Sequence, residues 1–205
     1  MEEYLTVKTR ARVETVIERS RFIATICRVE SADEANAFLE SVKKEFPDAT
    51  HHPFAYVTER GGYSRFSDDG EPSGTSGAPI MDVLKNACVF DTAIVVTRYF
   101  GGIKLGTGGL ARAYGRTAAE ALSSAGAVIR SLCFKCEATL PYDKQSAFPK
   151  IKTGEGLVTS TDYLDEVKIR FAIKKSAFPA FRESFMNALS GKREITVTGE
   201  DYFDL

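Results

Sequence analysis

Hydrophobic positions in the first two thirds of the chain recur with the spacings of both strands and helices. Apolar and β-branched runs with a period near two predict strands, and apolar residues at i, i+3 and i+4 predict helices. Ser31 with Glu34 forms a capping-box pattern at one helix start. The predicted elements are strands at 13–18, 20–29, 54–58, near 65 and at 92–98, and helices at 31–45, 79–87 and 109–125.

The last third shows a more regular pattern. It predicts strands at 132–140, 157–162, 165–173 and 194–198, and helices at 141–151 and 178–189. This β-α-β-β-α-β order is that of the split βαβ, ferredoxin-like arrangement. We therefore expect an α+β protein with an N-terminal domain at 1–130 and a C-terminal domain at 131–205.

A glycine-rich basic loop follows the strand predicted at 92–98. Between Asp91 and Glu120 the chain carries four basic residues and no acid. A strand, a glycine-rich loop and a helix start together favour anion binding, although glycines also serve tight turns and close packing. Neither the Walker pattern nor G-x-G-x-x-G is present. The candidate RNA- or anion-binding residues are Arg98, Tyr99, Gly101, Gly102, Lys104, Gly106 and Arg112.

A polar loop at 66–80 supplies three carboxylates within four positions, followed by hydroxyls. Its candidate residues are Asp68, Asp69, Glu71, Ser73 and Thr75. Hard oxygen ligands of this kind suit a divalent metal or a substrate hydroxyl. Alternatively, the acids cap turns and pair with Arg65 or Arg98. The spacing matches no EF-hand, and we assign no metal site, no cofactor and no catalytic residue.

His51 and His52 are the only histidines. Adjacent residues of a strand point to opposite faces, so at most one of them reaches a shared site. We add His51 to the polar-loop candidates, with a hydrogen-bonded surface histidine as the alternative. We expect one histidine and the two loops to converge on one groove of the N-terminal domain.

Three segments resemble the signature blocks of the IMPACT/YigZ family, in the family's order. They read T-H-H-P-F-A-Y, S-D-D-G-E-P-S-G-T-S-G-A-P-I and V-V-T-R-Y-F-G-G-I-K-L-G-T-G-G-L-A-R-A-Y, within roughly residues 18–125. The chain departs from the usual pattern at His52, Pro53 and Phe54, where Asn, Cys and Trp are expected, and at Ala78, which is often Lys or Gln.

The resemblance implies a fold for each domain. For the N-terminal domain it implies the fold shared by a small-subunit ribosomal protein, domain IV of elongation factor G and the GHMP kinases. For the C-terminal domain it implies a ferredoxin-like fold, similar to domain V of elongation factor G. Eukaryotic relatives are translational regulators that compete for the activator of the general-control kinase, but those forms carry a different appended domain.

Composition narrows the function classes. A net charge of −1 argues against attraction of nucleic acid by the whole protein, so any basic surface is local. We find no membrane-length apolar run and no signal-peptide pattern, and we expect a cytoplasmic protein with no membrane partner. The four cysteines fit reduced, mostly buried small hydrophobes, because the C-x-x-C at 133–136 lies in a predicted strand.

Two functions remain open. The first is a non-catalytic binding protein linked to translation or its regulation, with RNA, the ribosome or a translation-associated protein as partner. The second is an enzyme acting on a phosphorylated small molecule or nucleotide, with the glycine loop holding phosphate and the acidic loop supplying metal or base. We favour the binding protein because no nucleophile, base and orienting residue can be recognised as a set.

Overall fold

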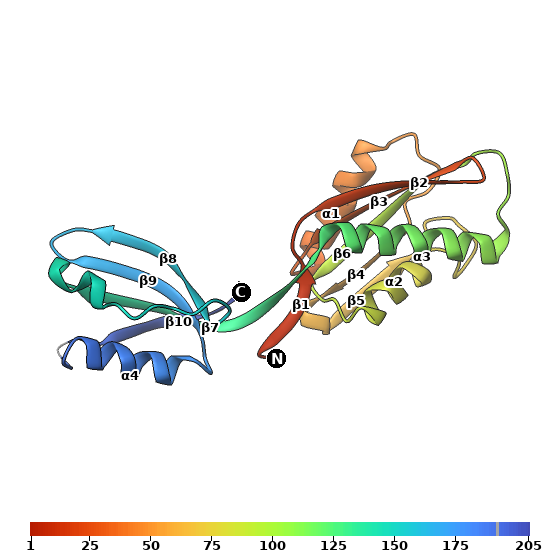
Figure 1. Ribbon diagram of the computed structural model, residues 1–205. Helices are drawn as coiled ribbons and strands as arrows, with labels where there is room; N and C mark the ends of the chain where they lie inside the picture. Colours follow the sequence, from red (N-terminus) through yellow and green to blue (C-terminus); the bar gives the residue numbers. More distant parts are fainter. Residues whose placement is uncertain (192) are drawn as a thin grey trace. The chain divides into compact units, whose positions relative to one another are not determined.

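The computed structural model describes residues 1–191 and 193–205, which divide into two compact units. Residues Tyr4–Val128 form the N-terminal unit (Figure 1). Residues Ile129–Leu205 form the C-terminal unit together with Met1–Glu3. Inside the C-terminal unit Leu132 donates its backbone N–H to the Glu2 carbonyl, and the Ser131 hydroxyl donates to Glu3. The sequence pattern did not indicate this place for the first three residues.

The N-terminal unit is built on a five-stranded antiparallel sheet. Its strands are β2 (Ala11–Ile17), β3 (Ser20–Arg28), β4 (Phe54–Thr58), β5 (Tyr63–Ser67) and β6 (Thr92–Tyr99), in the order β2-β3-β6-β4-β5. The short strand β1 (Glu3–Val7) precedes them, and a 3-10 turn (Glu59–Gly61) links β4 to β5. The hairpin predicted across Gly61-Gly62 is confirmed.

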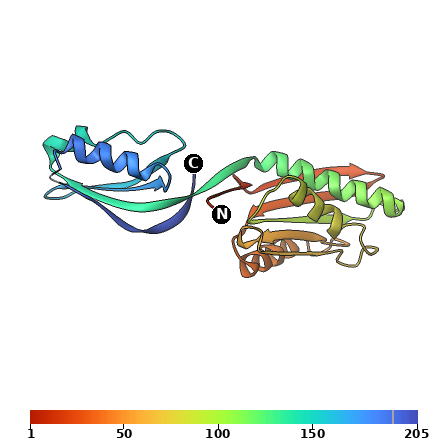
Figure 2. The ribbon, with the colours of Figure 1, turned by 90° about the horizontal axis from the view of Figure 1, so that it is seen from below.

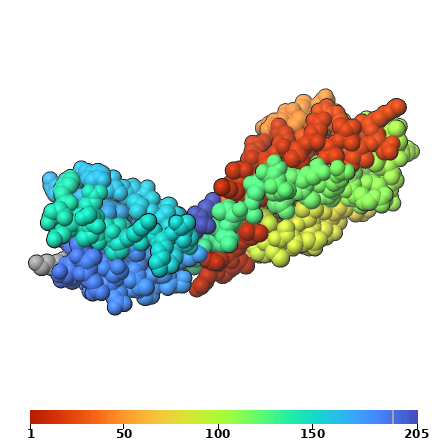
Figure 3. Space-filling view, in the orientation of Figure 1, coloured from red at the N-terminus to blue at the C-terminus, as the bar shows by residue number. Residues whose placement is uncertain are grey.

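Helices cover both faces of this sheet (Figure 2). On one face α1 (Ala32–Glu45) packs with Phe54, Tyr56 and Val95. On the other face α2 (Gly77–Asn86) and α3 (Gly106–Ala125) enclose the larger core. The space-filling view shows α3 exposed along the visible face beside the hairpin of β2 and β3 (Figure 3). Ser31 caps α1 as predicted by accepting the Glu34 N–H at 3.2 Å.

The C-terminal unit has four strands in the order β10-β7-β9-β8, all paired antiparallel. They are β7 (Ala127–Leu140), β8 (Gly156–Tyr163), β9 (Val167–Lys174) and β10 (Ile195–Asp204), with α4 at Phe178–Ala188. Alternate residues of β9 pack with Phe181 and Phe185 of α4 to form the core.

Three expectations for the C-terminal unit need correction. The α-helix predicted at 141–151 is a short 3-10 helix, Tyr142–Ala147, because Pro149 forces Phe148 into extended backbone. Strand β7 begins five residues earlier than expected. Strand β10 continues six residues beyond Thr198, because a bulge leaves Thr198 unpaired and Gly199 resumes the pairing opposite Lys135.

The mixed helix and strand composition confirms the predicted fold class. The C-terminal elements follow the predicted order, with a 3-10 helix in the first helical position. The kinship of each unit with a named fold remains a prediction.

Candidate functional site

Arg98, the next-to-last residue of β6, is the centre of a buried polar cluster formed with Ser20, Glu71 and Tyr114. Its Nη1 donates to Glu71 Oε1 at 2.6 Å, and its Nη2 donates to Ser20 Oγ at 3.4 Å. The Tyr114 hydroxyl, from α3, donates to the same Glu71 oxygen at 2.7 Å. We call these four residues the Arg98 cluster. It joins the acidic loop, the β6 end and α3.

Aromatic rings enclose the guanidinium of Arg98. Its carbon lies 5.4 Å from the ring centroids of both Phe22 and Phe100. Arg98 is 5% exposed and Glu71 8% exposed, so the ion pair is shielded from water. Burial, reinforced by the hydrogen bond to Glu71, raises the pKa of Tyr114 far above its ordinary value. Tyr114 therefore stays a neutral hydrogen-bond donor.

The glycine loop packs against the β2–β3 turn at this cluster. Glu18 and Arg19 form that turn, and both have positive φ angles, 45° and 65°. Gly101 lies so close to the turn that an added Cβ would overlap the Arg19 carbonyl and the Ser20 nitrogen. Its N–H donates to Ser20 Oγ at 3.1 Å. Close backbone approach therefore explains why position 101 is glycine. Gly102 and Gly106 have a different reason, because their φ angles of 84° and 69° lie in the left-handed region that favours glycine.

The acidic loop directs its carboxylates toward its own backbone. Asp68 Oδ1 accepts the N–H groups of Ser76 and Gly77, where α2 begins, and Oδ2 accepts the Gly74 N–H. Burial raises the pKa of Asp68, but these hydrogen bonds outweigh it and the pKa lies below its ordinary value. Asp68 thus stabilises the start of α2 from outside the helix.

The two histidines hold the same loop from the β4 side. His51 Nδ1 lies 2.8 Å from the Asp69 carbonyl, and the His52 backbone N–H donates to Asp69 Oδ2 at 2.7 Å. Burial lowers the pKa of His52. Thr75 is buried and donates to the Pro72 carbonyl, whereas Ser73 is exposed. Among the described residues no group of three or more His, Cys, Asp or Glu side chains is placed to hold a metal ion.

Arg98 and Tyr99 lie on opposite faces of the sheet, which separates two of the sequence candidates. Arg98 faces α3, whereas the Tyr99 hydroxyl donates to Asp48 beyond the end of α1, at 2.8 Å. Arg21 lies 5.2 Å from the centroid of the Tyr99 ring. The two residues therefore do not form one surface. Because its guanidinium is buried and ion-paired, Arg98 does not present a phosphate-binding group to solvent.

Two other candidates, Lys104 and Arg112, line an open hollow of about 550 Å³. We call it the basic hollow. Both side chains are exposed and form no ion pair within residues 1–191 and 193–205. Arg116 also lines the hollow and pairs with Glu120. The lining residues are Ile17, Glu18, Ile103, Lys104, Leu105, Gly109, Arg112, Ala113 and Arg116.

The first turn of α3 adds to the positive charge of the basic hollow. Gly106–Ala125 is described throughout, and its first turn has no acidic residue and no side-chain cap. Its free N–H groups carry the positive end of the helix dipole. Arg112 reaches this turn, since a Cβ added at Gly108 would lie 3.5 Å from Arg112 Nη1. The arrangement can accept an anion.

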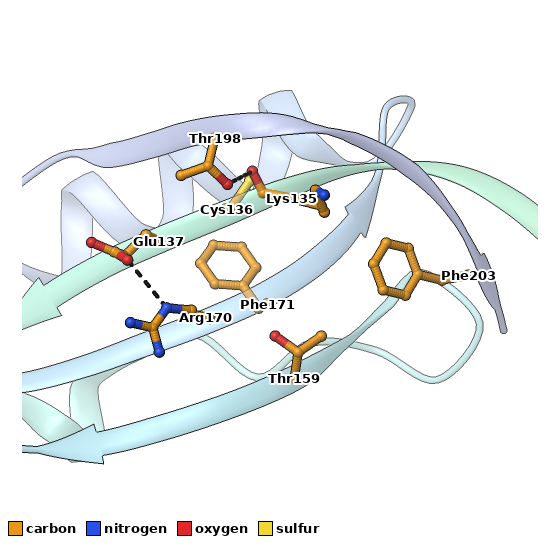
Figure 4. A pocket seen from close by; sticks show the side chains of 8 residues that line it. All are labelled: Lys135, Cys136, Glu137, Thr159, Arg170, Phe171, Thr198 and Phe203. Carbon is orange, nitrogen blue, oxygen red and sulfur yellow. Dashed lines mark hydrogen bonds and ion pairs between the residues drawn. The ribbon is translucent and has the colours of Figure 1, made fainter.

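A second hollow, of about 340 Å³, lies on the sheet of the C-terminal unit (Figure 4). Glu137 pairs there with Arg170 at 3.3 Å and with Lys168 at 2.7 Å. The charge of Glu137 is therefore compensated by these two cations. Cys136, which also lines it, is buried like Cys133, and burial raises the pKa of both thiols to about 11. The lining residues are Lys135, Cys136, Glu137, Thr159, Arg170, Phe171, Thr198 and Phe203.

The structure thus divides the sequence candidates into two sets. His51, Asp68, Asp69, Glu71 and Arg98 meet through internal hydrogen bonds, as the alternative interpretation of the acidic loop expected, with Glu71 as the partner of Arg98. Lys104 and Arg112 face solvent. Sequence reasoning missed Ser20, Phe22, Phe100 and Tyr114. The sequence pattern predicts Ser20 and Phe22 only as strand residues. The one signal for their role is the strand alternation, which places both on the sheet face that α3 covers.

The fold and this site define a two-unit α+β protein in which a buried ion-pair cluster supports a solvent-exposed basic loop. Residues 18–122 match the family model described as the Impact N-terminal domain. The chain is 39% identical over 197 residues to "IMPACT family member YvyE" of Bacillus subtilis, covering 95% of this chain and 91% of the relative. It is 34% identical over 212 residues to "IMPACT family member YigZ" of Escherichia coli, covering 98% and 100%.

The chain therefore belongs to the IMPACT family. A solved structure titled "Crystal structure of an hypothetical protein" matches 98% of this chain and 100% of its own, with a TM-score of 0.63 and 31% identity. In the described residues no helix is both long and apolar enough to cross a membrane.

Proposed function

We propose that this IMPACT family member is a non-catalytic binding protein linked to translation or its regulation, with RNA, the ribosome or a ribosome-associated protein as partner. The basic hollow carries the proposal. Lys104 and Arg112 are exposed cations without an ion-pair partner in the described part of the chain, beside an uncapped helix start. Of the three partners, RNA fits this chemistry best because its backbone supplies closely spaced phosphates.

The charge of the hollow is local. The whole chain has a net charge of −1, so long-range attraction to RNA is weak and the contact depends on a few groups. Glu18 is the one acid among the residues that line the hollow, opposite three cations. A small number of phosphate contacts predicts modest affinity with a clear dependence on salt.

The alternative is an enzyme acting on a phosphorylated small molecule or nucleotide. A hollow of about 550 Å³ with two free cations also suits such a ligand. The acidic loop gives this alternative little support, because the carboxylates of Asp68 and Asp69 already accept backbone hydrogen bonds and Glu71 is paired with Arg98. We therefore keep the binding protein as the proposal.

The test is ribosome-profile fractionation of the tagged full-length chain at low and high salt, with RNA affinity and nucleotide turnover measured on the same preparation. Lys104→Ala and Arg112→Ala should each weaken RNA or ribosome association at unchanged melting temperature. Each should also reduce the slope of log affinity against log salt by about one unit.

Lys85→Ala is the matched control, because Lys85 is an exposed lysine near the end of α2, away from the basic hollow. It should leave affinity and slope unchanged. Unchanged affinity and slope in both Lys104→Ala and Arg112→Ala would contradict the proposal. Nucleotide turnover lost in these two variants would support the enzyme instead.

A further inference from the structure

Phe100 is an exposed aromatic residue whose position is fixed from several sides. Its side chain is 48% exposed. The Arg98 guanidinium lies 5.4 Å from its ring centroid, and this guanidinium is itself held by Glu71 and Ser20. The Phe100 backbone N–H donates to Thr50 Oγ1 at 3.2 Å. The Phe100 ring is therefore held in place by the Arg98 guanidinium and is also partly exposed to solvent, so it can stack with a planar group of a ligand.

The loop that begins at Phe100 also supplies residues that line the basic hollow. Ile103, 37% exposed, and Lys104 line the hollow. Phe100 and Lys104 are four residues apart, so their Cα atoms are separated by at most about 14 Å. Arg19, an exposed cation of the β2–β3 turn, has its backbone against Gly101 in this loop. Exposed cations therefore belong both to this loop and to the turn that packs against it.

From this arrangement we infer that the loop binds single-stranded nucleic acid, with one unpaired base stacked on Phe100 and the neighbouring phosphates at Lys104 and Arg112. The inference rests on the proposed function and adds the strand class of the ligand. Bases of a duplex are already stacked on one another and expose only edges in the grooves, so a duplex offers the cations its phosphates but offers Phe100 no base face.

A single exposed aromatic residue is ordinary, and Phe66 illustrates this, because it is also 48% exposed. Phe66 lies on β5, whereas Phe100 adjoins the loop that lines the basic hollow. The two residues form a matched pair for experiment. They have equal exposure, and only one belongs to the proposed surface.

The chain contains no tryptophan, so Phe100→Trp and Phe66→Trp each introduce a single tryptophan, whose emission can be excited apart from that of the tyrosines. We would titrate both full-length variants with a 12-nucleotide oligo(U), a 12-nucleotide oligo(dT) and a 12-base-pair RNA duplex. Stacking should quench the Phe100→Trp emission with both single strands and much less with the duplex. The Phe66→Trp emission should not change. Equal quenching by duplex and single strand, or none at all, would overturn the inference.

Affinity measurements separate stacking from packing over Arg98. Phe100→Leu keeps apolar cover on the guanidinium and should weaken oligo(U) binding about 10-fold, whereas Phe100→Tyr should stay within about 2-fold of the wild type. Duplex affinity should be the same in all three. Should Phe100→Leu lower the melting temperature, the Phe100→Tyr affinity and the Phe100→Trp emission decide the question. Unchanged oligo(U) affinity in a folded Phe100→Leu protein would overturn the inference.

The outcomes distinguish the two proposals. If Lys104→Ala weakens RNA binding and Phe100→Leu does not, the proposed function stands and the stacking inference fails. If oligo(dT) binds more tightly than oligo(U) with full quenching, the single-strand inference stands and the link to translation fails.

Discussion

Arg98 shows at the scale of single residues why an unusual sequence motif can be structural. A buried guanidinium is costly unless it is paired and hydrogen-bonded, and removal of one partner leaves an uncompensated charge. Glu71 and Ser20 supply those partners, and two aromatic rings exclude water. The basic residue that stood out in the sequence therefore stabilises the loop, while its neighbours Lys104 and Arg112 face solvent.

Tyr114→Phe tests the cluster by removing one hydrogen bond to a charged group. We expect a loss of about 1.5 kcal/mol in the free energy of unfolding at pH 7, because the Glu71 carboxylate loses a buried donor. The pKa of Tyr114 is raised in the folded protein. The contribution of the Tyr114 hydroxyl to the free energy of unfolding is therefore fully present below pH 10, the ordinary tyrosine value, and is lost as pH rises above it. Urea denaturation from pH 7 to 10.5 measures both effects.

The difference in stability between the wild type and Tyr114→Phe should accordingly narrow above about pH 10, since only the wild type can ionise this side chain on unfolding. Other tyrosines titrate equally in both proteins and cancel from the comparison. A difference that stays constant, or grows, with rising pH would show that the Tyr114 hydroxyl is not held neutral in the fold.

At the scale of elements, the acidic loop and the glycine loop are each held by the ends of helices and strands. The acidic loop begins α2 through Asp68, and the glycine loop packs on the β2–β3 turn through Gly101. The Asp68 carboxylate of the acidic loop satisfies backbone N–H groups that the start of α2 would otherwise leave unpaired. This accounts for a large share of the polarity and glycine content that suggested a site.

Asp68→Asn keeps the shape of the side chain and removes its charge. We expect the free energy of unfolding to fall by about 1 to 2 kcal/mol at pH 7, because the carboxylate meets the N-terminal end of α2. The pKa of Asp68 is lowered in the fold, so its contribution is present above the ordinary value of 3.8 and disappears as pH falls below it. Thermal unfolding at pH 3 and pH 7 provides the measurement.

Asp82→Asn, on the exposed side of α2, is the control and should leave stability nearly unchanged at both pH values. If Asp68→Asn proves as stable as the wild type at pH 7, the carboxylate is not the cap of α2 that its hydrogen bonds indicate.

Two alanine substitutions separate packing from conformational freedom in the glycine loop. Gly101→Ala should cost about 3 kcal/mol, because its Cβ would overlap the Arg19–Ser20 backbone. Gly108→Ala should stabilise the free protein by about 0.5 kcal/mol, because Gly108 lies in α3 and its added Cβ meets only Arg112 Nη1, at 3.5 Å. Urea denaturation of both variants checks this, and a destabilised Gly108→Ala would mean that its backbone is strained.

At the scale of the whole molecule, the chain consists of two units that each have a core of their own. The C-terminal core gathers buried residues from β7, β9 and α4, among them Phe171 and Phe185, and includes Leu189 directly after α4. The N-terminal unit has a core on each face of its sheet. Separate cores favour independent folding.

A fragment of residues 131–205 should therefore fold alone. We expect a cooperative thermal transition by circular dichroism and protected amides in β7 and β9, whose residues pair along 133–140 and 167–174. A fragment of residues 129–205 is the comparison, since Leu205 donates its N–H to the Ile129 carbonyl. Absence of a cooperative transition in both fragments would place the domain boundary elsewhere.

The sequence by itself determined the family, the fold class and most elements, because these depend on local periodicity, caps and long contiguous motifs. The apolar spacing of 31–45 and the Ser31–Glu34 cap correspond to α1, and the alternation of 165–173 corresponds to β9. The helix predicted at 141–151 was wrong although its end was also local, because Pro149 restricts Phe148 to extended backbone and the prediction did not apply that rule.

Only the tertiary structure decided the roles of the polar residues. Whether Arg98 meets phosphate or Glu71 depends on a pairing 27 positions apart, and its ring partners Phe22 and Phe100 lie on different segments. Glycines in the same run serve different purposes, because only Gly101 meets the β2–β3 turn. Burial and long-range contact set the charge environment of a side chain, and neither can be computed from spacing along one chain.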